Sequence, residues 1–171
     1  MRASGLSRIE TLIILTLVAI LSAIAIPTIA RTVRRSRTSE AAEKLAYMFR
    51  AASTYYESER VDQDAARVGE CVPRTSKTLP AVPRSRPRQA DFSQDPTFSQ
   101  IDFSSSDPVY FSYTFVGIDR CRFRGGPAFT ARAEGNLDDD STKSLFERAA
   151  RATAQGEIEG TSGLYVQQKS E

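Results

Sequence analysis

One acidic side chain stands at the start of a long apolar segment near the N-terminus. Residues 6–29 read LSRIETLIILTLVAILSAIAIPTI, and no charged side chain occurs from Thr11 to Ala30. A carboxylate at the edge of an apolar environment is costly to desolvate without a partner, so Glu10 requires an explanation. Either Glu10 meets a cation, or it lies at headgroup depth beside a helix N-terminus, where the helix dipole favours negative charge.

The other reactive side chains do not form a catalytic set. The chain has no histidine, and its sequence contains no P-loop, no G-x-S-x-G motif and no activated cysteine motif. Acids that lie close together in a polar turn, as from Asp138 to Asp140, are ordinarily surface residues and not the acid pair of a glycosidase. The sequence therefore predicts a protein that is not an enzyme and that uses no cofactor.

The acidic turn from Asn136 to Asp140 has part of the spacing of a calcium loop. Three side chains that carry oxygen follow at the later ligand positions of an EF-hand loop: Thr142, Ser144 and Glu147. The glycine that such loops need for their sharp turn is missing after Asp140. A solvated β-turn is the favoured interpretation, calcium binding is the alternative, and no metal site is predicted.

Cys71 and Cys121 are the only cysteines, and their even number fits one disulfide in an oxidising compartment. A zinc site would need both thiols together with carboxylates, which is an unusual ligand set. A bridge would close a loop of about 50 residues, to which the chain-entropy model assigns about 4 kcal/mol. Two unrelated free thiols are the alternative, because sequence alone does not determine pairing.

The apolar run is long enough to cross a membrane. At 1.5 Å per residue, about 20 helical residues cover the roughly 30 Å of a bilayer's hydrocarbon core. A secretory signal peptide has a shorter apolar core, of about 7 to 15 residues. An ordinary signal anchor is the second alternative; more arginines follow the run than precede it, so the positive-inside rule alone would keep its C-terminal part in the cytoplasm.

The N-terminal sequence resembles that of a type IV prepilin. The resemblance rests on the string GLSRIE of residues 5–10, on the apolar run, and on Ala25-Ile26-Pro27. It implies that a membrane peptidase cuts between Gly5 and Leu6, which removes the leader 1–5, and that the new N-terminus at Leu6 is then methylated.

The same resemblance gives roles to two helix residues. Glu10 would neutralise the N-terminal ammonium of a neighbouring subunit during assembly, which supplies the cation that its carboxylate lacks. Arg8 is a local alternative partner for Glu10. Pro27 would kink the helix, because proline removes one helical hydrogen bond and clashes with the preceding turn.

The function implied by the resemblance is that of a structural subunit of a bacterial type IV pilus or pilus-like filament. The precursor would be a single-pass inner-membrane protein with a cytoplasmic N-terminus, and the assembled protein a filament on the cell surface. The implied partners are inner-membrane lipid, the prepilin peptidase and methyltransferase, the pilus assembly machinery, and other pilin subunits in a homopolymer or mixed filament. A minor pilin or pseudopilin of a type II secretion-like machine, and a membrane-anchored extracytoplasmic binding domain, are the alternatives.

The charge distribution gives no strong case for a nucleic-acid partner, because the net charge is only +2. Basic residues gather in two segments, Arg31 to Arg37 and Pro73 to Arg88, whereas the turn from Asn136 to Asp140 is acidic. A basic cluster beside a membrane span more often contacts anionic headgroups or acidic neighbouring subunits than DNA. No specific nucleic acid is therefore expected.

Beyond Pro27 the helical period continues to about Arg60. Apolar residues recur at three- and four-residue steps, at Leu45, Met48, Phe49, Ala52, Tyr55 and Tyr56. Polar residues are expected on the opposite face, at Glu40, Lys44, Arg50 and Glu57. This pattern predicts an amphipathic helix that packs on a globular head; a coiled-coil partner helix is the alternative, although the stripe is short for sustained heptads.

The sequence after residue 60 predicts a loop followed by a sheet. Residues 61–107 are rich in proline and have no clear period, apart from a short helical turn near Pro96 to Gln100. Alternating sequence predicts strands at Val109 to Val116 and at Ala128 to Ala133. Leu145 to Ala154 suits either a helix or a strand, and the resemblance favours a strand there.

Together the segments predict an α+β, pilin-like fold in which a long N-terminal helix packs on an antiparallel β-sheet. The expected organisation is a leader at 1–5, a transmembrane and assembly helix at 6–29, an amphipathic helix at 30–60, a variable loop at 61–107 and the sheet of the head at 108–171.

Overall fold

The computed structural model describes residues 7–58, 60–61, 67–137, 139, 141–161 and 163–167. Two compact units are distinguished along the chain, Met1–Ser36 and Arg37–Glu171. We refer to them as the N-terminal unit and the head. The leader and its cleavage site at Gly5 and Leu6 lie outside the described residues.

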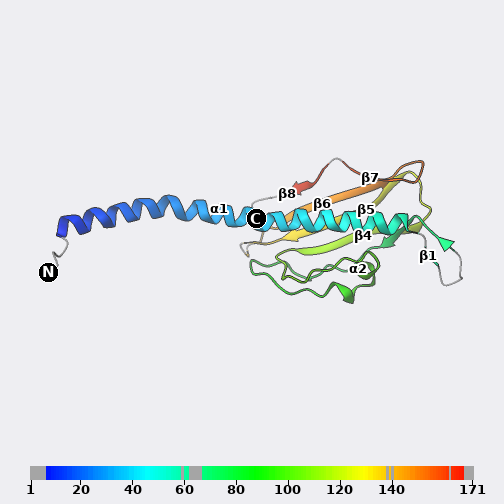
Figure 1. Cartoon of the computed structure of the whole chain (residues 1–171), viewed down its shortest axis with the longest axis horizontal. Coiled ribbons are helices and arrows are strands. Elements are labelled where there is room, and N and C mark those ends of the chain that lie inside the picture. The colour runs from blue at the N-terminus through cyan, green and yellow to red at the C-terminus, as the bar shows by residue number, and fades with distance from the viewer. Residues whose placement is uncertain are drawn as a thin grey trace, which may run out of the picture. The chain divides into compact units, whose positions relative to one another are not determined.

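A single helix, α1 (Arg8–Glu57), supplies residues to both units (Figure 1). It contains no glycine, and Pro27 is its only proline. The helix is assigned without interruption through Pro27, so the kink remains a prediction. It ends at Glu57, three residues before the predicted end near Arg60.

In the head, six strands form one antiparallel sheet in the order β3-β4-β5-β6-β7, and β8 pairs with another part of β6. The strands are β3 (Cys71–Arg74), β4 (Ser112–Cys121), β5 (Gly126–Gly135), β6 (Ser144–Ala152), β7 (Ile158–Gly160) and β8 (Tyr165–Gln167). Two further strands, β1 (Arg60–Val61) and β2 (Arg67–Val68), form a separate antiparallel pair.

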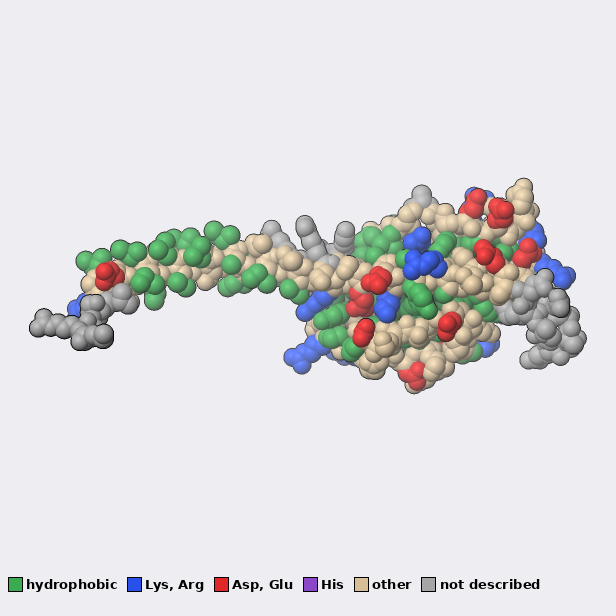
Figure 2. All heavy atoms as spheres, in the orientation of Figure 1, with side chains coloured by type: hydrophobic (Ala, Val, Ile, Leu, Met, Phe, Trp, Pro, Cys, Tyr) green, Lys and Arg blue, Asp and Glu red, His purple; other side chains and the backbone are tan. Residues whose placement is uncertain are grey.

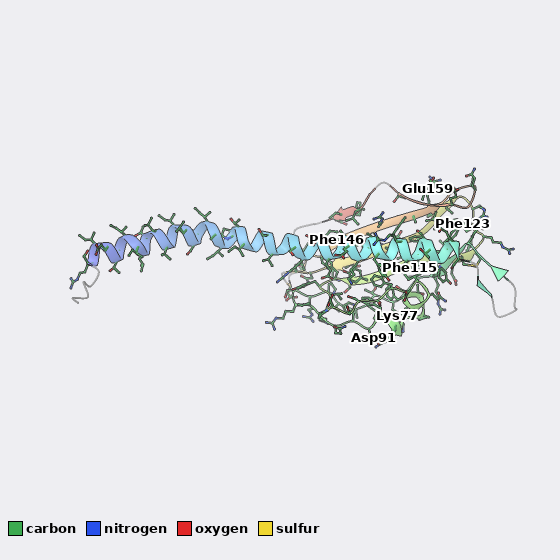
Figure 3. The ribbon with its side chains drawn as sticks, in the orientation of Figure 1. Lys77, Asp91, Phe115, Phe123, Phe146 and Glu159 are labelled. Carbon is green, nitrogen blue, oxygen red and sulfur yellow. A yellow bond between two sulfur atoms is a disulfide. The ribbon has the colours of Figure 1, made fainter. Side chains whose placement is uncertain are left out.

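The head part of α1 packs against this sheet, so the predicted α+β arrangement is confirmed (Figure 1). The apolar stripe of the helix is buried at Ala41, Leu45, Met48, Ala52 and Tyr56. The ring of Phe49 lies 5.6 Å from the ring of Phe129 on β5. Phe115 and Phe146, labelled in Figure 3, are buried from the sheet side. The helix and the sheet thus share one core.

The strand predictions are confirmed with shifted ends. The first predicted strand starts later, at Ser112, and continues to Cys121, while Phe111, Tyr113 and Phe115 are buried as predicted. The ambiguous segment is a strand, β6, because its buried residues follow a period of two, with Phe146, Ala150 and Ala152 facing the core.

The segment expected to be a loop contains its own ordered core. It includes β3, a short 3-10 helix η1 (Phe92–Gln94) and α2 (Pro96–Gln100), where a helical turn was predicted. The rings of Phe92 and Phe98 meet edge to face at 5.2 Å, and Phe92 lies 4.9 Å from Phe103. Aromatic burial therefore orders a segment that has no regular period in its sequence.

Candidate assembly surfaces

In the N-terminal unit, the large apolar side chains of α1 are exposed. Between Ile9 and Ile29 they keep 49 to 71% of their surface accessible. Residues Arg8–Ile29 have a mean hydropathy of 2.7 and are long and apolar enough to cross a membrane. Figure 2 shows hydrophobic side chains along this part of the helix. A surface of this kind is stable in water only when lipid or other protein covers it.

Four threonine hydroxyls of this part of α1 are satisfied within the helix itself. Thr11, Thr16, Thr28 and Thr32 each donate to the carbonyl oxygen four residues earlier, at 2.8 to 3.1 Å. Such bonds cost little in a medium without water, whereas an unpaired hydroxyl there would be expensive. The polar groups of these threonines are therefore compatible with an apolar environment.

Glu10 closes the N-terminus of α1 through a capping box. The backbone N–H of Ser7 donates to Oε2 of Glu10 at 2.7 Å, and the backbone N–H of Glu10 donates to the hydroxyl oxygen of Ser7 at 3.3 Å. Among the described residues no donor reaches Oε1. This cap was not predicted, although Ser7 and Glu10 have the S-x-x-E spacing that is typical of a capping box.

Glu40 is a polar anchor between α1 and the sheet, and its predicted place on the polar face of the helix is wrong. Its Oε1 atom accepts a bond from the backbone N–H of Tyr110 at 3.1 Å and from the hydroxyl of Tyr113 at 2.9 Å. Glu40 directly precedes Ala41, the first buried apolar residue of the stripe, and so lies at the border of the buried face.

Burial changes the ionisation of both partners. It raises the pKa of the Glu40 carboxyl group, and the hydrogen bonds from Tyr113 and Tyr110 partly oppose this effect. Burial, together with the nearby charge of Glu40, raises the pKa of the Tyr113 hydroxyl well above its usual value. Tyr113 therefore keeps its proton at neutral pH and remains a donor to Glu40.

Cys71 and Cys121 form a disulfide. They are directly opposite each other in the register of β3 and β4, where the first residue of one strand faces the last residue of the other. The disulfide interpretation of the two cysteines is confirmed, and the bond ties the start of the long connection to the sheet.

The acidic turn contacts the arginine-rich part of the same connection. Asp139 accepts bonds from the backbone N–H of Ser85, at 3.1 Å, and from its hydroxyl. These bonds, aided by the charges of Arg84 and Arg86, lower the pKa of Asp139. Asp138 and Asp140 lie outside the described residues.

One side chain of the alternative calcium loop is engaged elsewhere in the head. Glu147 lies on β6, where it forms an ion pair with Arg132 of β5 at 2.6 Å. Within the part of the chain that the structure describes, no three acidic, cysteine or histidine side chains are grouped to hold a metal ion.

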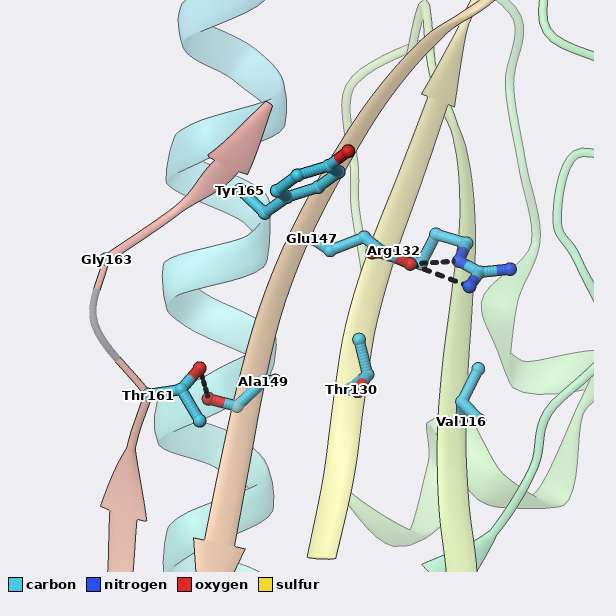
Figure 4. A pocket seen from close by; sticks show the side chains of 8 residues that line it. All are labelled: Val116, Thr130, Arg132, Glu147, Ala149, Thr161, Gly163 and Tyr165. Atoms are coloured by element: carbon cyan, nitrogen blue, oxygen red, sulfur yellow. Dashed lines mark hydrogen bonds and ion pairs between the residues drawn. The ribbon is translucent and has the colours of Figure 1, made fainter. Parts of the chain in front are cut away.

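An open groove of about 470 Å³ lies on the sheet face that points away from the core (Figure 4). Its lining includes Val116, Thr130, Tyr165 and the ion pair of Arg132 with Glu147. Thr161 closes one side, where its hydroxyl donates to the carbonyl oxygen of Ala149 at 3.2 Å. The charges in the groove are paired with each other, and the groove holds no acid–base or nucleophilic set.

An N-terminal apolar helix followed by an antiparallel sheet is a pilin-like layout. Comparison with protein-family models, with curated proteins and with solved structures finds no match to this chain.

Proposed function

We propose that this chain is a structural subunit of a type IV pilus or pilus-like filament that assembles through the N-terminal part of α1. The observation that carries the proposal is the exposed apolar surface of α1 from Ile9 to Ile29, which begins at a single carboxylate. The prepilin-like string at residues 5–10 supports the same function.

In the membrane, lipid would cover this surface and the precursor would be stored there. In a filament, the same surface would be buried against the helices of neighbouring subunits. Apolar helices gain little from leaving lipid for each other, because lipid tails are as apolar as their side chains. Packing and polar pairing must therefore determine the assembled state, which gives Glu10 its importance.

The capping box leaves Glu10 able to serve two partners. Oε2 accepts the backbone N–H of Ser7, while no donor from the described residues binds Oε1. After cleavage, the ammonium group of Leu6 in another subunit would bind there through a charge-assisted hydrogen bond. In an apolar environment such a pair replaces a costly unpaired charge.

The N-terminal mass of the protein from producing cells tests the processing step. We expect residues 1–5 to be missing and the chain to begin with a methylated Leu6. A mature protein that still begins with Met1 would overturn the proposal. The abundance of the chain in sheared surface fibres would then separate a main subunit from a minor one.

Substitutions at Glu10 test assembly. Glu10→Ala and Glu10→Gln should leave the precursor in the membrane and stop filament growth, because both remove the negative charge. Ser7→Ala is the matched control, since it removes one bond of the cap but keeps the carboxylate. We expect this variant to form filaments. Normal filament yield from Glu10→Gln, measured by shearing and quantification, would show that the proposed ion pair is wrong.

A further inference from the structure

Three arginines are exposed within five residues of the long connection. Arg84, Arg86 and Arg88 alternate with Ser85 and Pro87. We call residues 84–88 the arginine loop. Lys and Arg side chains are visible at both ends of the head in Figure 2. The arginine loop differs from ordinary solvated charges in its backbone anchoring and its charge balance.

The backbone of the arginine loop is held in place at three points. Arg37 of α1 donates to the carbonyl oxygen of Ser85 at 3.4 Å. Asp139 accepts from the backbone N–H of Ser85 at 3.1 Å. Arg88 and Val109 exchange two backbone hydrogen bonds, at 2.8 and 2.9 Å. The three guanidinium groups thus extend from a fixed framework.

No ion pair within salt-bridge distance joins the three guanidinium groups to a described acid. Among the described residues, the ion pairs of the head involve other cations, at Arg124, Arg132 and Lys143. Asp139, which accepts bonds from the backbone and hydroxyl of Ser85, interacts electrostatically with Arg84 and Arg86. It supplies one negative charge beside three positive ones, so among the described residues the loop keeps an excess of positive charge.

The loop is tied to Arg37, the first residue of the head part of α1. Arg37, which contacts Ser85, follows Ile29 by eight residues. At 1.5 Å per helical residue this is about 12 Å along the chain. The headgroup layer adds several ångströms to the hydrocarbon core, and charges act over a Debye length of about 8 Å at physiological salt. The length of chain between the span and Arg37 therefore allows the arginine loop to come within electrostatic reach of the headgroups.

We propose that the arginine loop binds the phosphate groups of anionic phospholipids on the membrane surface beside the α1 span. The planar guanidinium group matches phosphate with two parallel hydrogen bonds, and three such groups on a fixed backbone favour a dense anionic surface. This inference rests on the part of the proposed function that puts Arg8–Ile29 in a membrane, and not on filament assembly.

Lipid retention by the full-length chain tests the inference. The protein would be purified in detergent, supplied with equal amounts of phosphatidylglycerol and phosphatidylcholine, and examined by native mass spectrometry. We expect preferential retention of phosphatidylglycerol. The triple variant R84Q/R86Q/R88Q should lower that retention at least about tenfold, because each lost charge weakens surface attraction several-fold.

Two further variants act as controls. R120Q/R122Q/R151Q removes three exposed arginines near the other end of β4, about 30 Å from the arginine loop by strand length, and should retain phosphatidylglycerol normally. R84K/R86K/R88K keeps the charge and should retain most of the binding. The thermal midpoint of each variant establishes that the head is intact.

Two results would overturn the inference. One is equal retention of phosphatidylglycerol by wild type and R84Q/R86Q/R88Q. If this variant retains the lipid but loses binding to duplex DNA or to another copy of the chain, the inference is likewise wrong. The other is an equal loss in both glutamine triples, which would mean that the lipid responds only to total charge. A chain that begins at Met1 but retains phosphatidylglycerol through the loop would refute filament assembly and leave this inference intact.

Discussion

Leu21 in the N-terminal unit is 66% exposed, whereas Leu45 in the head is completely buried, although both belong to α1. The head supplies its own cover for the apolar stripe of α1, in the form of the sheet. The N-terminal unit supplies none for the residues from Ile9 to Ile29. The two parts of one helix therefore differ: the described residues of the head bury the apolar stripe of one part, whereas the apolar side chains of the other part stay exposed.

The difference is also visible in how polar groups are satisfied. In the N-terminal unit, threonine hydroxyls and Glu10 bond to the helix itself. In the head, Glu40 bonds to Tyr110 and Tyr113, far away in sequence. Long-range polar bonds specify one packing arrangement, whereas local ones leave the helix surface free to meet several kinds of neighbour.

The same leucine truncation in both parts of α1 should give the largest contrast. Leu45→Ala should lower the free energy of unfolding of the head by about 2 to 5 kcal/mol, through lost burial and a cavity. Leu21→Ala should change it by less than about 0.5 kcal/mol. Denaturant unfolding of the full chain in micelles, followed by tyrosine near-UV circular dichroism, measures both. Equal losses would remove the distinction between the two parts.

A charge placed in each part gives a second contrast. Leu17→Arg should weaken membrane integration by about 2.5 to 3.5 kcal/mol, because a guanidinium near the middle of a span is costly to insert. Thr54→Arg, at an exposed position of α1 in the head, should leave integration unchanged. Alkaline extraction of membranes from producing cells measures the integrated fraction. Full retention of Leu17→Arg in the membrane would contradict the proposed span.

The smallest contrast concerns the polar anchor of the head. Glu40→Ala should lower the free energy of unfolding by about 1 to 3 kcal/mol, because the buried hydroxyl of Tyr113 loses its acceptor. Glu40→Gln should cost less, since its amide oxygen can take the place of Oε1. The same unfolding measurement compares the two variants, and an equal cost for both would mean that the hydrogen bonds are not the source of the stability.

The titration of Glu40 makes the difference in stability between the wild type and Glu40→Gln depend on pH. Burial raises its pKa above 4.5, so the folded state holds the proton at pH values where the unfolded state has lost it. The stability that comes from the protonated group is complete below about pH 4.5 and is lost as the pH rises through the higher folded value. Relative to Glu40→Gln, the wild type should therefore become less stable as the pH increases across this window.

The sequence predicted what depends on local pattern. The length of the apolar run, the stripe from Leu45 to Tyr56 and the alternation of Phe111, Tyr113 and Phe115 each express a period that burial imposes on its own segment. The segment from Leu145 to Ala154 marks the limit of that approach. Its residues favour a helix by propensity, and packing of Phe146 and Ala150 on the core decides for a strand.

Features that join distant segments could not be predicted in this way. The bonds of Glu40 with Tyr113 and of Ser85 with Asp139 each join residues more than fifty positions apart. None of these four residues has an unusual sequence context. The same applies to the order imposed on residues 75–107 by Phe92, Phe98 and Phe103. The capping box of Ser7 and Glu10 is, by contrast, a local pattern that could have been predicted from the sequence.

The internally bonded threonines of α1 have a consequence for transfer between environments. When this helix moves from one apolar surrounding to another, the hydrogen bonds of Thr16, Thr28 and Thr32 travel with it unbroken. The free-energy barrier to extraction thus contains no contribution from these groups. In the proposed filament, the helix would slide lengthwise past its neighbours at a cost set by shape and by the charges of its first turn.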